Sequence, residues 1–286
     1  MSSPKVLTAE QVRCFKDDGY IFPVRVMSAE DAAGYRARLE AFERSQGAPI
    51  KGDQRTKNYL LFRWAQEIMR HPVILDAVQD LYGPDLLVYT ATSWIKEPNS
   101  GSFVSWHQDA TYFGLEPLDN VTVWVALSRA DSQAGCMRVL PKSHKQGQLP
   151  VRLEPVKDNL LSSGQHVVHR FDEADTIEMP LEPGEMSMHH TCTIHGSPGN
   201  RSNDRRMGIC MHYMPAYVRP FQRLIDANAI CSATLVRGKK HHDLFPIEAP
   251  ALSDADDNAR AAHAAGVNSY RNMMLALGNQ TGGRFD

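Results

Sequence analysis

Residues 86–95 read Leu-Leu-Val-Tyr-Thr-Ala-Thr-Ser-Trp-Ile, a stretch rich in β-branched and aromatic residues that directly predicts a strand. Similar runs, separated by Gly, Pro and Asn, lie at 121–127, 136–140, 175–179, 185–189 and 207–214. Many short strands with such spacing are typical of an antiparallel double-sheet barrel, because closure or stacking hides the exposed strand edges. The predicted fold class is therefore mainly β, with flanking helices.

Three helices are predicted before the first of these strands. Thr8-Ala-Glu-Gln11 is a capping-box pattern, and the helix that it starts stops at Gly19. Ser28 caps a second helix, which ends near Gly47. Apolar residues at helical spacing from about 64 to 81 predict a third helix, ended by the Gly-Pro pair that precedes the first strand.

The remaining segments are less regular. The link from about 149 to 173 looks irregular, and a loop of that length in a compact domain often serves as a lid or binding loop. After Pro220 the chain reads as helix plus polar loops, and residues 282–286 are expected to fray. With no repeat and no clear linker, we predict one domain over 1–286, with a helical N-terminal part (1–84), a barrel core (about 85–216) and a C-terminal helical and loop extension (217–286).

Composition narrows the class of protein. Hydrophobic residues make up 42% of the 286 residues and charged residues 22%, which is ordinary for a globular protein. A formal net charge of −2 gives no electrostatic case for binding nucleic acid or an anionic membrane. Five scattered cysteines without a CxxC pair, and a start without the apolar core of a secretory signal, favour a reducing cytoplasm.

A histidine and an aspartate stand two residues apart in Trp106-His107-Gln108-Asp109. Residues i and i+2 of a strand point to the same face. His107 and Asp109 are therefore able to bind one ion inside a barrel, while Gln108 turns away. A third ligand must then come from a distant strand, which a rolled sheet places opposite.

Three later histidines compete for the place of the third ligand: His189, His190 and His195. His195 is favoured because Ser197 and Arg206 follow it, and His190 is the main alternative. Two imidazoles and one carboxylate form the facial triad, which holds non-haem Fe(II) and leaves positions open for oxygen chemistry.

Arg206 lies eleven positions after His195 and has two interpretations. In the functional one, its planar and permanently charged guanidinium binds a carboxylate with two hydrogen bonds inside the barrel. In the other, three arginines form a basic turn between two strands. The functional interpretation suits 2-oxoglutarate, which chelates Fe(II) at one end and needs a buried cation at its far carboxylate. Arg205 would point to the opposite face, so only one of the two arginines serves.

Together these residues resemble the phytanoyl-CoA dioxygenase family of Fe(II)/2-oxoglutarate oxygenases, over roughly residues 8–215. The resemblance is carried by Trp106-His-Gln-Asp109, Val121-Thr-Val-Trp-Val-Ala-Leu127, Gly135-Cys-Met-Arg-Val-Leu-Pro-Lys-Ser-His144, and His195-Gly-Ser followed by Arg206. The family's middle segment usually reads Gly-x-Leu-x-x-x-Pro-Gly-Ser-His. Met137 and Lys142 are therefore departures, in a turn that does not touch the ligands.

The resemblance implies a double-stranded β-helix, a cupin-like jelly roll, with N-terminal and C-terminal helices packed on one face. It implies that His107, Asp109 and His195 bind Fe(II), and that Arg206 and Ser197 grip the far carboxylate of 2-oxoglutarate. Some relatives halogenate, and those have Ala or Gly at the carboxylate position. Asp109 therefore favours hydroxylation over chlorination.

The predicted function is that of an Fe(II)- and 2-oxoglutarate-dependent dioxygenase. It hydroxylates an unactivated C–H bond of a small molecule, while 2-oxoglutarate and O2 become succinate and CO2. Two alternatives remain open: a cupin-type metal dioxygenase that does not use 2-oxoglutarate, and a non-catalytic barrel that serves as a binding protein. Arg206 distinguishes the predicted dioxygenase from the cupin-type enzyme, since only a 2-oxoglutarate enzyme needs a guanidinium for its co-substrate.

Substrate contacts are expected near a basic, polar cluster that precedes an apolar helix, made of Lys51, Arg55, Lys57 and Asn58. In relatives this region approaches the mouth of the active site, where it suits an anionic substrate; a solvated loop is the alternative. The predicted contacts are Lys57, Tyr59, Tyr112 and Phe113 for the substrate and Ser93 for 2-oxoglutarate. The sequence leaves open whether the substrate is a CoA thioester, a natural-product intermediate, a phosphonate or an amino-acid derivative, and leaves the oligomeric state open too.

Overall fold

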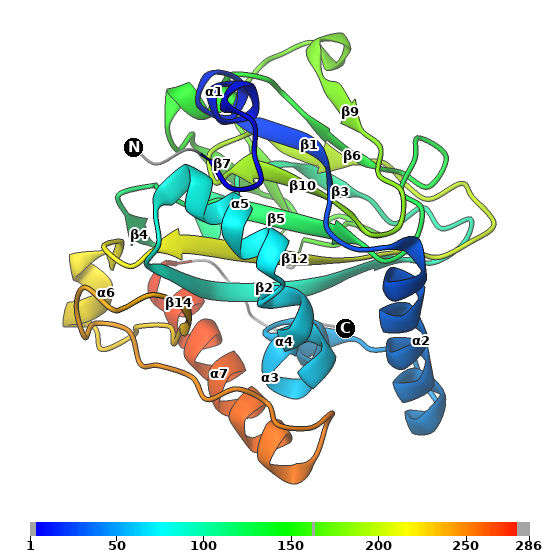
Figure 1. Cartoon of the computed structure of the whole chain (residues 1–286). Helices are drawn as coiled ribbons and strands as arrows, with labels where there is room; N and C mark the ends of the chain where they lie inside the picture. Colours follow the sequence, from blue (N-terminus) through cyan, green and yellow to red (C-terminus); the bar gives the residue numbers. More distant parts are fainter. Residues whose placement is uncertain (1–3, 162–163, 279–286) are drawn as a thin grey trace.

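The largest sheet has six strands in the order β1–β10–β5–β12–β2–β14, and every neighbouring pair is antiparallel (Figure 1). The computed structural model describes residues 4–161 and 164–278. The six strands are Tyr20–Arg25 (β1), Leu86–Lys96 (β2), Val121–Ala126 (β5), Glu185–His190 (β10), Arg206–Pro215 (β12) and Thr234–Arg237 (β14). The strands predicted at 86–95, 121–127, 185–189 and 207–214 are confirmed.

A second, four-stranded antiparallel sheet has the order β3–β11–β6–β9. Its strands are Val104–His107 (β3), Met137–Val139 (β6), Ile177–Met179 (β9) and His195–Ser197 (β11). Two short ribbons pair Leu115–Glu116 (β4) with Arg219–Pro220 (β13), and Val151–Leu153 (β7) with Gln165–Val167 (β8). The chain passes several times between these two antiparallel sheets, as in the predicted jelly roll.

Strand β12 shows how the sequence assigns the two faces of the large sheet. Side chains alternate along a strand, so every second residue shares a face. One set packs into the apolar cluster beneath the helices: Met207, Ile209, Met211 and Tyr213. The other set faces the barrel interior and is chemically mixed: Arg206, Gly208, Cys210 and His212. The sheet therefore has an apolar face that holds the helices and a polar face available for a site.

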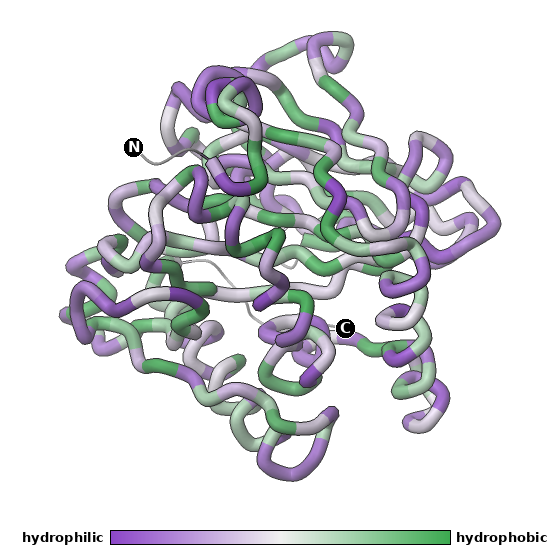
Figure 2. Tube along the Cα trace, in the orientation of Figure 1, coloured by the Kyte–Doolittle hydropathy of each residue, from purple (hydrophilic) through white to green (hydrophobic). Residues whose placement is uncertain are grey.

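The described helices lie mainly on the apolar face of this sheet (Figure 1). The α-helices are Ala9–Asp18 (α1), Ala29–Gln46 (α2), Asn58–Leu61 (α3), Arg63–Met69 (α4), Pro72–Tyr82 (α5), Gln222–Asp226 (α6) and Asp257–Ala276 (α7). Short 3-10 helices are Gly52–Arg55 (η1), Asp109–Tyr112 (η2), Ser143–Gln146 (η3) and Glu173–Asp175 (η4). Figure 2 shows hydrophobic stretches along the strands and hydrophilic stretches in the outlying loops, as expected for a core between sheet and helices.

The first two helices begin and end where the sequence predicts. Thr8 forms a capping box with Gln11, and Gly19 ends α1 in the left-handed conformation. Ser28 caps α2 through the backbone N–H of Asp31. The single third helix predicted from 64 to 81 is wrong, because two helices, α4 and α5, cover that stretch. Pro72 starts α5, since proline has no N–H to donate and fits the first turn of a helix rather than its middle.

Strands outside residues 85–216 also belong to the barrel. β1 comes from the N-terminal part and extends the large sheet beside β10, a strand that the sequence analysis did not find. β14 comes from the C-terminal extension and pairs with β2. The irregular link of 149–173 contains the ribbon of β7 and β8. Residues 282–286, expected to fray, lie outside the described residues.

No described helix is both long enough and apolar enough to span a lipid bilayer.

Candidate metal centre

His107, Asp109 and His195 meet inside the barrel, on the small sheet. His107 ends β3, Asp109 begins η2 directly after it, and His195 begins β11. β3 and β11 are antiparallel neighbours, and His107 and His195 are paired across them. All three side chains are buried, and one ligand atom from each lies within 4.8 Å of the other two. The predicted convergence of two distant stretches is therefore present in the structure.

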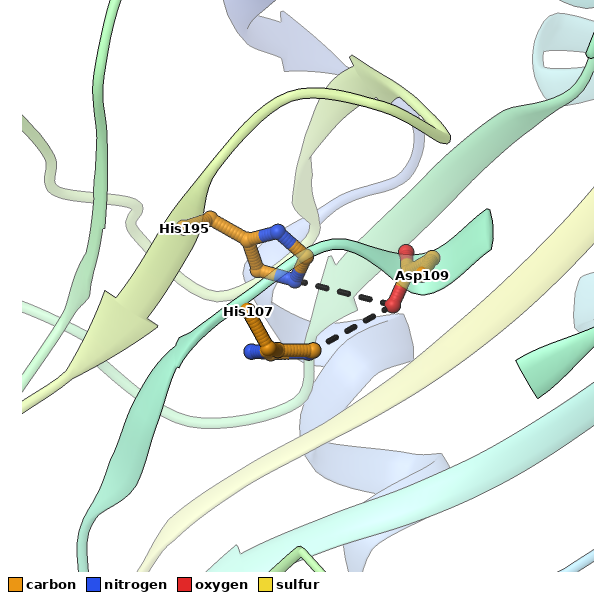
Figure 3. A group of neighbouring side chains, drawn as sticks. All are labelled: His107, Asp109 and His195. Carbon is orange, nitrogen blue, oxygen red and sulfur yellow. Dashed lines mark ion pairs between the residues drawn. The ribbon is translucent and has the colours of Figure 1, made fainter. Parts of the chain in front are cut away.

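The two rings face one oxygen of the carboxylate (Figure 3). The Nε2 atom of His107 lies 3.5 Å from Oδ1 of Asp109, and Nε2 of His195 lies 3.7 Å from the same oxygen. The ring centroids are 4.1 Å apart. Gln108, between His107 and Asp109 in the sequence, turns away as predicted. Its Nε2 donates to the carbonyls of Cys192 and Gly147.

Backbone carbonyls select the tautomer that each neutral histidine ring adopts. Nδ1 of His107 lies 2.9 Å from the carbonyl oxygen of Ser105, and Nδ1 of His195 lies 3.0 Å from that of Thr193. A carbonyl only accepts, so each Nδ1 carries the proton and donates it. Each neutral ring then presents the lone pair of Nε2 toward Asp109. This donor set fits a divalent transition metal, since ligating histidines usually donate their other N–H in this way.

The second oxygen of Asp109 is held by groups of the large sheet. Oδ2 accepts from the hydroxyl of Thr122 at 2.5 Å and lies 3.1 Å from Nε2 of His189. The hydroxyl of Thr122 also lies 2.9 Å from Nδ1 of His212. His189 and His212 are both paired with Thr122 in the sheet, on the neighbouring strands β10 and β12. Oδ1 is thus the carboxylate oxygen that faces the two triad rings.

Sequence reasoning found the three ligand candidates but not this supporting group. The alternation of Met186 and Met188 with polar residues is a signal that His189 faces the interior, since both methionines belong to the apolar cluster. The structure does not bring His190, the alternative third ligand, to Asp109. The ring of His190 lies instead beside those of Phe15 and His144.

Electrostatics keep the cluster in the protonation states that metal ligation needs. Burial raises the pKa of Asp109, but the neighbouring imidazoles of His195, His107 and His189 outweigh it and hold that pKa well below its usual range. Burial lowers the pKa of His195 well below its ordinary value, and the rings of His107 and His189 lower it further. At neutral pH the carboxylate is ionised and His195 is neutral.

Arg206 begins β12 on the interior face of the large sheet, and no described residue places an anion beside it. Its side chain is buried, 3% exposed, and its guanidinium carbon lies 4.4 Å from the centre of the Trp124 ring. No described residue forms a hydrogen bond or ion pair with the guanidinium, and its Nε is fully buried without a partner. A Cβ at Gly208 would overlap the Trp124 ring, so the absence of a side chain there makes room for this stacking. Burial lowers the pKa of Arg206 to about 10, and the arginine is still charged at neutral pH.

Lys96 and Ser197 lie next to this guanidinium. Lys96 is paired with Arg206 across β2 and β12, and its Nζ donates to the hydroxyl of Ser197 at 2.7 Å. Burial, together with the charge of Arg206, lowers the pKa of Lys96 to about 6. Lys96, a basic residue that the sequence analysis did not single out, thus links Ser197 to the strand position opposite Arg206. The three residues form a basic site without a described carboxylate.

Ser93 lies on the other face of β2. Its hydroxyl accepts a hydrogen bond from Asn58 of α3 at 2.6 Å, which places it toward the helices. Lys96 faces the interior, and three positions along a strand reverse the face. The structure therefore does not bring Ser93 to the site, although the sequence analysis predicted a contact with 2-oxoglutarate.

A cavity of about 480 Å³ opens beside His107 and Asp109. Two of the four predicted substrate residues, Tyr112 and Phe113, line it, together with Trp94, Arg55, Tyr270 of α7 and the loop of residues 155–161. This loop belongs to the link predicted as a lid or binding loop.

Lys57 and Tyr59, the other two predicted substrate residues, are fully buried and do not line the cavity. The Nζ of Lys57 lies 2.6 Å from Oε1 of Glu248, and the hydroxyl of Tyr59 donates to Oε2 of the same carboxylate at 2.8 Å. Both residues therefore contact Glu248 of the C-terminal extension. Glu248 lies in a stretch without a helical or strand pattern, so the sequence could not predict this contact.

Comparison with known proteins gives a consistent set of relatives. The family model described as phytanoyl-CoA dioxygenase (PhyH) matches residues 15–208. Mouse peroxisomal phytanoyl-CoA dioxygenase is 25% identical over 232 residues, which cover 73% of this chain and 68% of that protein. A probable alpha-ketoglutarate-dependent hypophosphite dioxygenase of Stutzerimonas stutzeri is 29% identical over 237 residues, 74% of this chain and 80% of that protein.

Solved structures agree with these sequence matches. The non-heme monooxygenase ThoJ in its apo form has 31% identity and a TM-score of 0.82, covering 94% of this chain and 100% of that one. CytC3 with Fe(II) and alpha-ketoglutarate has 22% identity and a TM-score of 0.62, covering 89% of this chain and 96% of that one, and the likeness shows the fold.

Proposed function

The chain belongs to the phytanoyl-CoA dioxygenase family and is a non-haem Fe(II)- and 2-oxoglutarate-dependent dioxygenase; we propose that His107, Asp109 and His195 bind its iron and that it hydroxylates an unactivated C–H bond of a small molecule. The observation that carries the co-substrate assignment is the buried Arg206, which has no anionic partner among the described residues. A 2-oxoglutarate enzyme needs such a cation, whereas a cupin-type dioxygenase without 2-oxoglutarate does not.

Nε2 of each histidine and Oδ1 of Asp109 are the proposed ligand atoms. The carbonyls of Ser105 and Thr193 hold the rings in the tautomer that leaves Nε2 free. Thr122 and His189 occupy the other carboxylate oxygen, which favours ligation by a single oxygen. The bound metal and co-substrate supply the oxidising chemistry, in which 2-oxoglutarate and O2 become succinate and CO2 while a C–H bond becomes C–OH.

Arg206 and Ser197 are the proposed partners of the far carboxylate of 2-oxoglutarate. A guanidinium forms two parallel hydrogen bonds with a carboxylate, and these are strong where water is excluded. Lys96 links Ser197 to the strand position opposite Arg206. A bound carboxylate would also favour the charged form of Lys96, since an anion nearby raises the pKa of an amine. Asp109 supports hydroxylation over halogenation, because relatives that halogenate lack a carboxylate at that position.

A reducing compartment such as the cytoplasm fits the cysteines. All five are unpaired, and Cys136, Cys192, Cys210 and Cys231 are buried. A small-molecule substrate, with neither nucleic acid nor membrane as partner, fits the size of the cavity and the net charge of −2.

The proposal is tested without knowledge of the substrate. Aerobic incubation of the protein with Fe(II) and 2-oxoglutarate is expected to release succinate slowly, and His107→Ala is expected to abolish this release. His190→Gln is the matched control, since it removes a nearby imidazole that does not face Asp109. Succinate release that survives in His107→Ala, or disappears equally in His190→Gln, would contradict the proposed ligand set.

A further inference from the structure

Arg55 is a second guanidinium without an acid partner among the described residues, and it lies half-buried in the wall of the cavity. It ends η1, its Nε donates to the carbonyl of Ser93 at 3.0 Å, and its guanidinium carbon lies 5.3 Å from the centre of the Trp94 ring. Burial alone lowers the pKa of Arg55 to about 10, so it is charged at neutral pH. Among the described residues, no carboxylate pairs with it, and its two terminal nitrogens have no hydrogen-bond partner.

The backbone on both sides of Arg55 is fixed by the C-terminal extension. Two residues before it, Asp53 accepts from Arg271 of α7, with both carboxylate oxygens 2.8 Å from one guanidinium nitrogen. Two residues after it, Lys57 pairs with Glu248 at 2.6 Å. None of these contacts uses the guanidinium of Arg55. The arginine is thus held in place while its terminal nitrogens stay available, and a pre-organised group loses little entropy on binding a ligand.

The wall of the cavity carries four aromatic rings among threonine, aliphatic and charged residues, and it reaches the proposed iron ligands. Trp94, Tyr112, Phe113 and Tyr270 supply rings, and His107 and Asp109 line the same cavity. Lys157 also lines it, but its side chain is exposed to solvent. The volume of about 480 Å³ falls in the lower part of the range of small-molecule sites, about 300–1,000 Å³.

We propose that Arg55 binds a carboxylate group of the substrate, so that the substrate class is a small organic acid whose apolar body packs against the aromatic wall. A guanidinium on an aromatic face suits this task, because it stays charged and forms two hydrogen bonds with a planar carboxylate. With the acid group on Arg55, the apolar part of the molecule extends toward His107 and Asp109, where the oxidation takes place. This inference rests on the proposed function for its reaction, but its binding step does not depend on turnover.

The test measures the binding of small acids to the full chain loaded with Mn(II) and saturating 2-oxoglutarate. The 2-oxoglutarate fills the Arg206 site, and Mn(II) in place of Fe(II) prevents oxidation. The probes are phenylacetate, 3-phenylpropionate and 4-phenylbutyrate, each compared by calorimetry with its own amide. At least one acid is expected to bind about 10- to 100-fold more tightly than its amide, the difference that hydrogen bonds to a charged group provide. Arg55→Gln is expected to remove this preference.

Lys157→Gln is the matched control, because it removes one positive charge from the same wall without touching Arg55. Lys157→Gln is expected to keep the preference for the acid. The affinity of Arg55→Gln for 2-oxoglutarate is measured separately, and an unchanged value shows that this variant is folded. The inference is wrong if no acid binds more tightly than its amide, if Arg55→Gln keeps the preference, or if that variant weakens 2-oxoglutarate binding instead. A failure of succinate release with an intact Arg55-dependent preference would reject the proposed function alone.

Discussion

Lys57 and Arg206 are both cations buried in this protein, but among the described residues only Lys57 has an anion as its partner. Lys57 is 0% exposed and pairs with Glu248, whose two oxygens also accept from Tyr59, Ser232 and Thr234. Arg206 is 3% exposed, stacks on the Trp124 ring and has no anionic partner among the described residues. A buried charge is costly unless it is paired. The first region therefore serves the stability of the fold, and the second is a place for a ligand to supply the missing charge.

The largest expected effect comes from breaking the complete pair. Glu248→Gln keeps the shape of the side chain but leaves the ammonium of Lys57 buried without an anion. The free energy of unfolding is expected to fall by about 3–5 kcal/mol, measured by urea denaturation. Asp243→Asn is the control, because it removes an ion pair at the surface with Lys240 and should leave the transition unchanged. Equal transitions in the two variants would show that the buried pair does not stabilise the fold.

At Arg206, which has no anionic partner among the described residues, removal of the charge is expected to leave the fold at least as stable as before but to abolish stabilisation by 2-oxoglutarate. Arg206→Met should leave the unfolding free energy of the ligand-free protein unchanged or higher, since it removes an unpaired buried charge. With Mn(II) present, 2-oxoglutarate at one hundred times its dissociation constant should stabilise the unmodified protein by about 2.7 kcal/mol and the variant not at all. Arg205→Met is the control, because that neighbour pairs with Glu43 and Glu97 and faces away from the site. Stabilisation that persists in Arg206→Met would remove the basis for this assignment.

A smaller effect is expected in acid. Burial raises the pKa of Glu248, but the charge of Lys57 and the hydrogen bonds to the carboxylate outweigh it, so that this pKa lies below its ordinary value of 4.5. A carboxylate with a depressed pKa in the folded state stabilises the fold above its unfolded pKa, and this contribution is lost as the pH falls through the folded value. The stability difference between the unmodified protein and Glu248→Gln should therefore shrink below about pH 4.5. A difference that stays constant to pH 3 would contradict the depressed pKa.

Features that depend on local spacing could be predicted from the sequence. Strands and helix caps follow from local spacing. The His107–Asp109 pair was predicted from strand periodicity, but β3 ends at His107 and Asp109 reaches the site from the first position of η2. Alternation on β12 likewise separates Arg206 from Arg205. The third ligand needed a long-range pairing of β11 with β3, and the resemblance to a known family indicated it. Short motifs therefore identified the three ligand candidates, whereas helical spacing alone wrongly joined α4 and α5 into one helix.

Contacts between distant segments were not predictable in this way. Lys57 and Tyr59 are interpreted as substrate contacts in a basic cluster, but their partner Glu248 lies far along the chain, in a stretch without regular structure. Arg55, in the same cluster, does reach the cavity, and nothing in the local pattern distinguishes it from Lys57. The break at Pro72 was missed for a different reason, since the apolar spacing continues across it while the backbone hydrogen bonds do not.

Different segments of the chain supply the wall of the cavity and the proposed iron ligands, so substrate specificity can change separately from the oxidising chemistry. His107 and His195 belong to the small sheet, and Asp109 begins η2 just after it. In contrast, several residues that line the cavity come from segments outside both main sheets: Gly52, Arg55 and Thr56, the loop at 155–161, and Tyr270. Tyr270 also lies beyond residue 208, where the match to the family model ends. Exchange of these peripheral segments would therefore retarget the catalyst and leave its oxidising machinery intact.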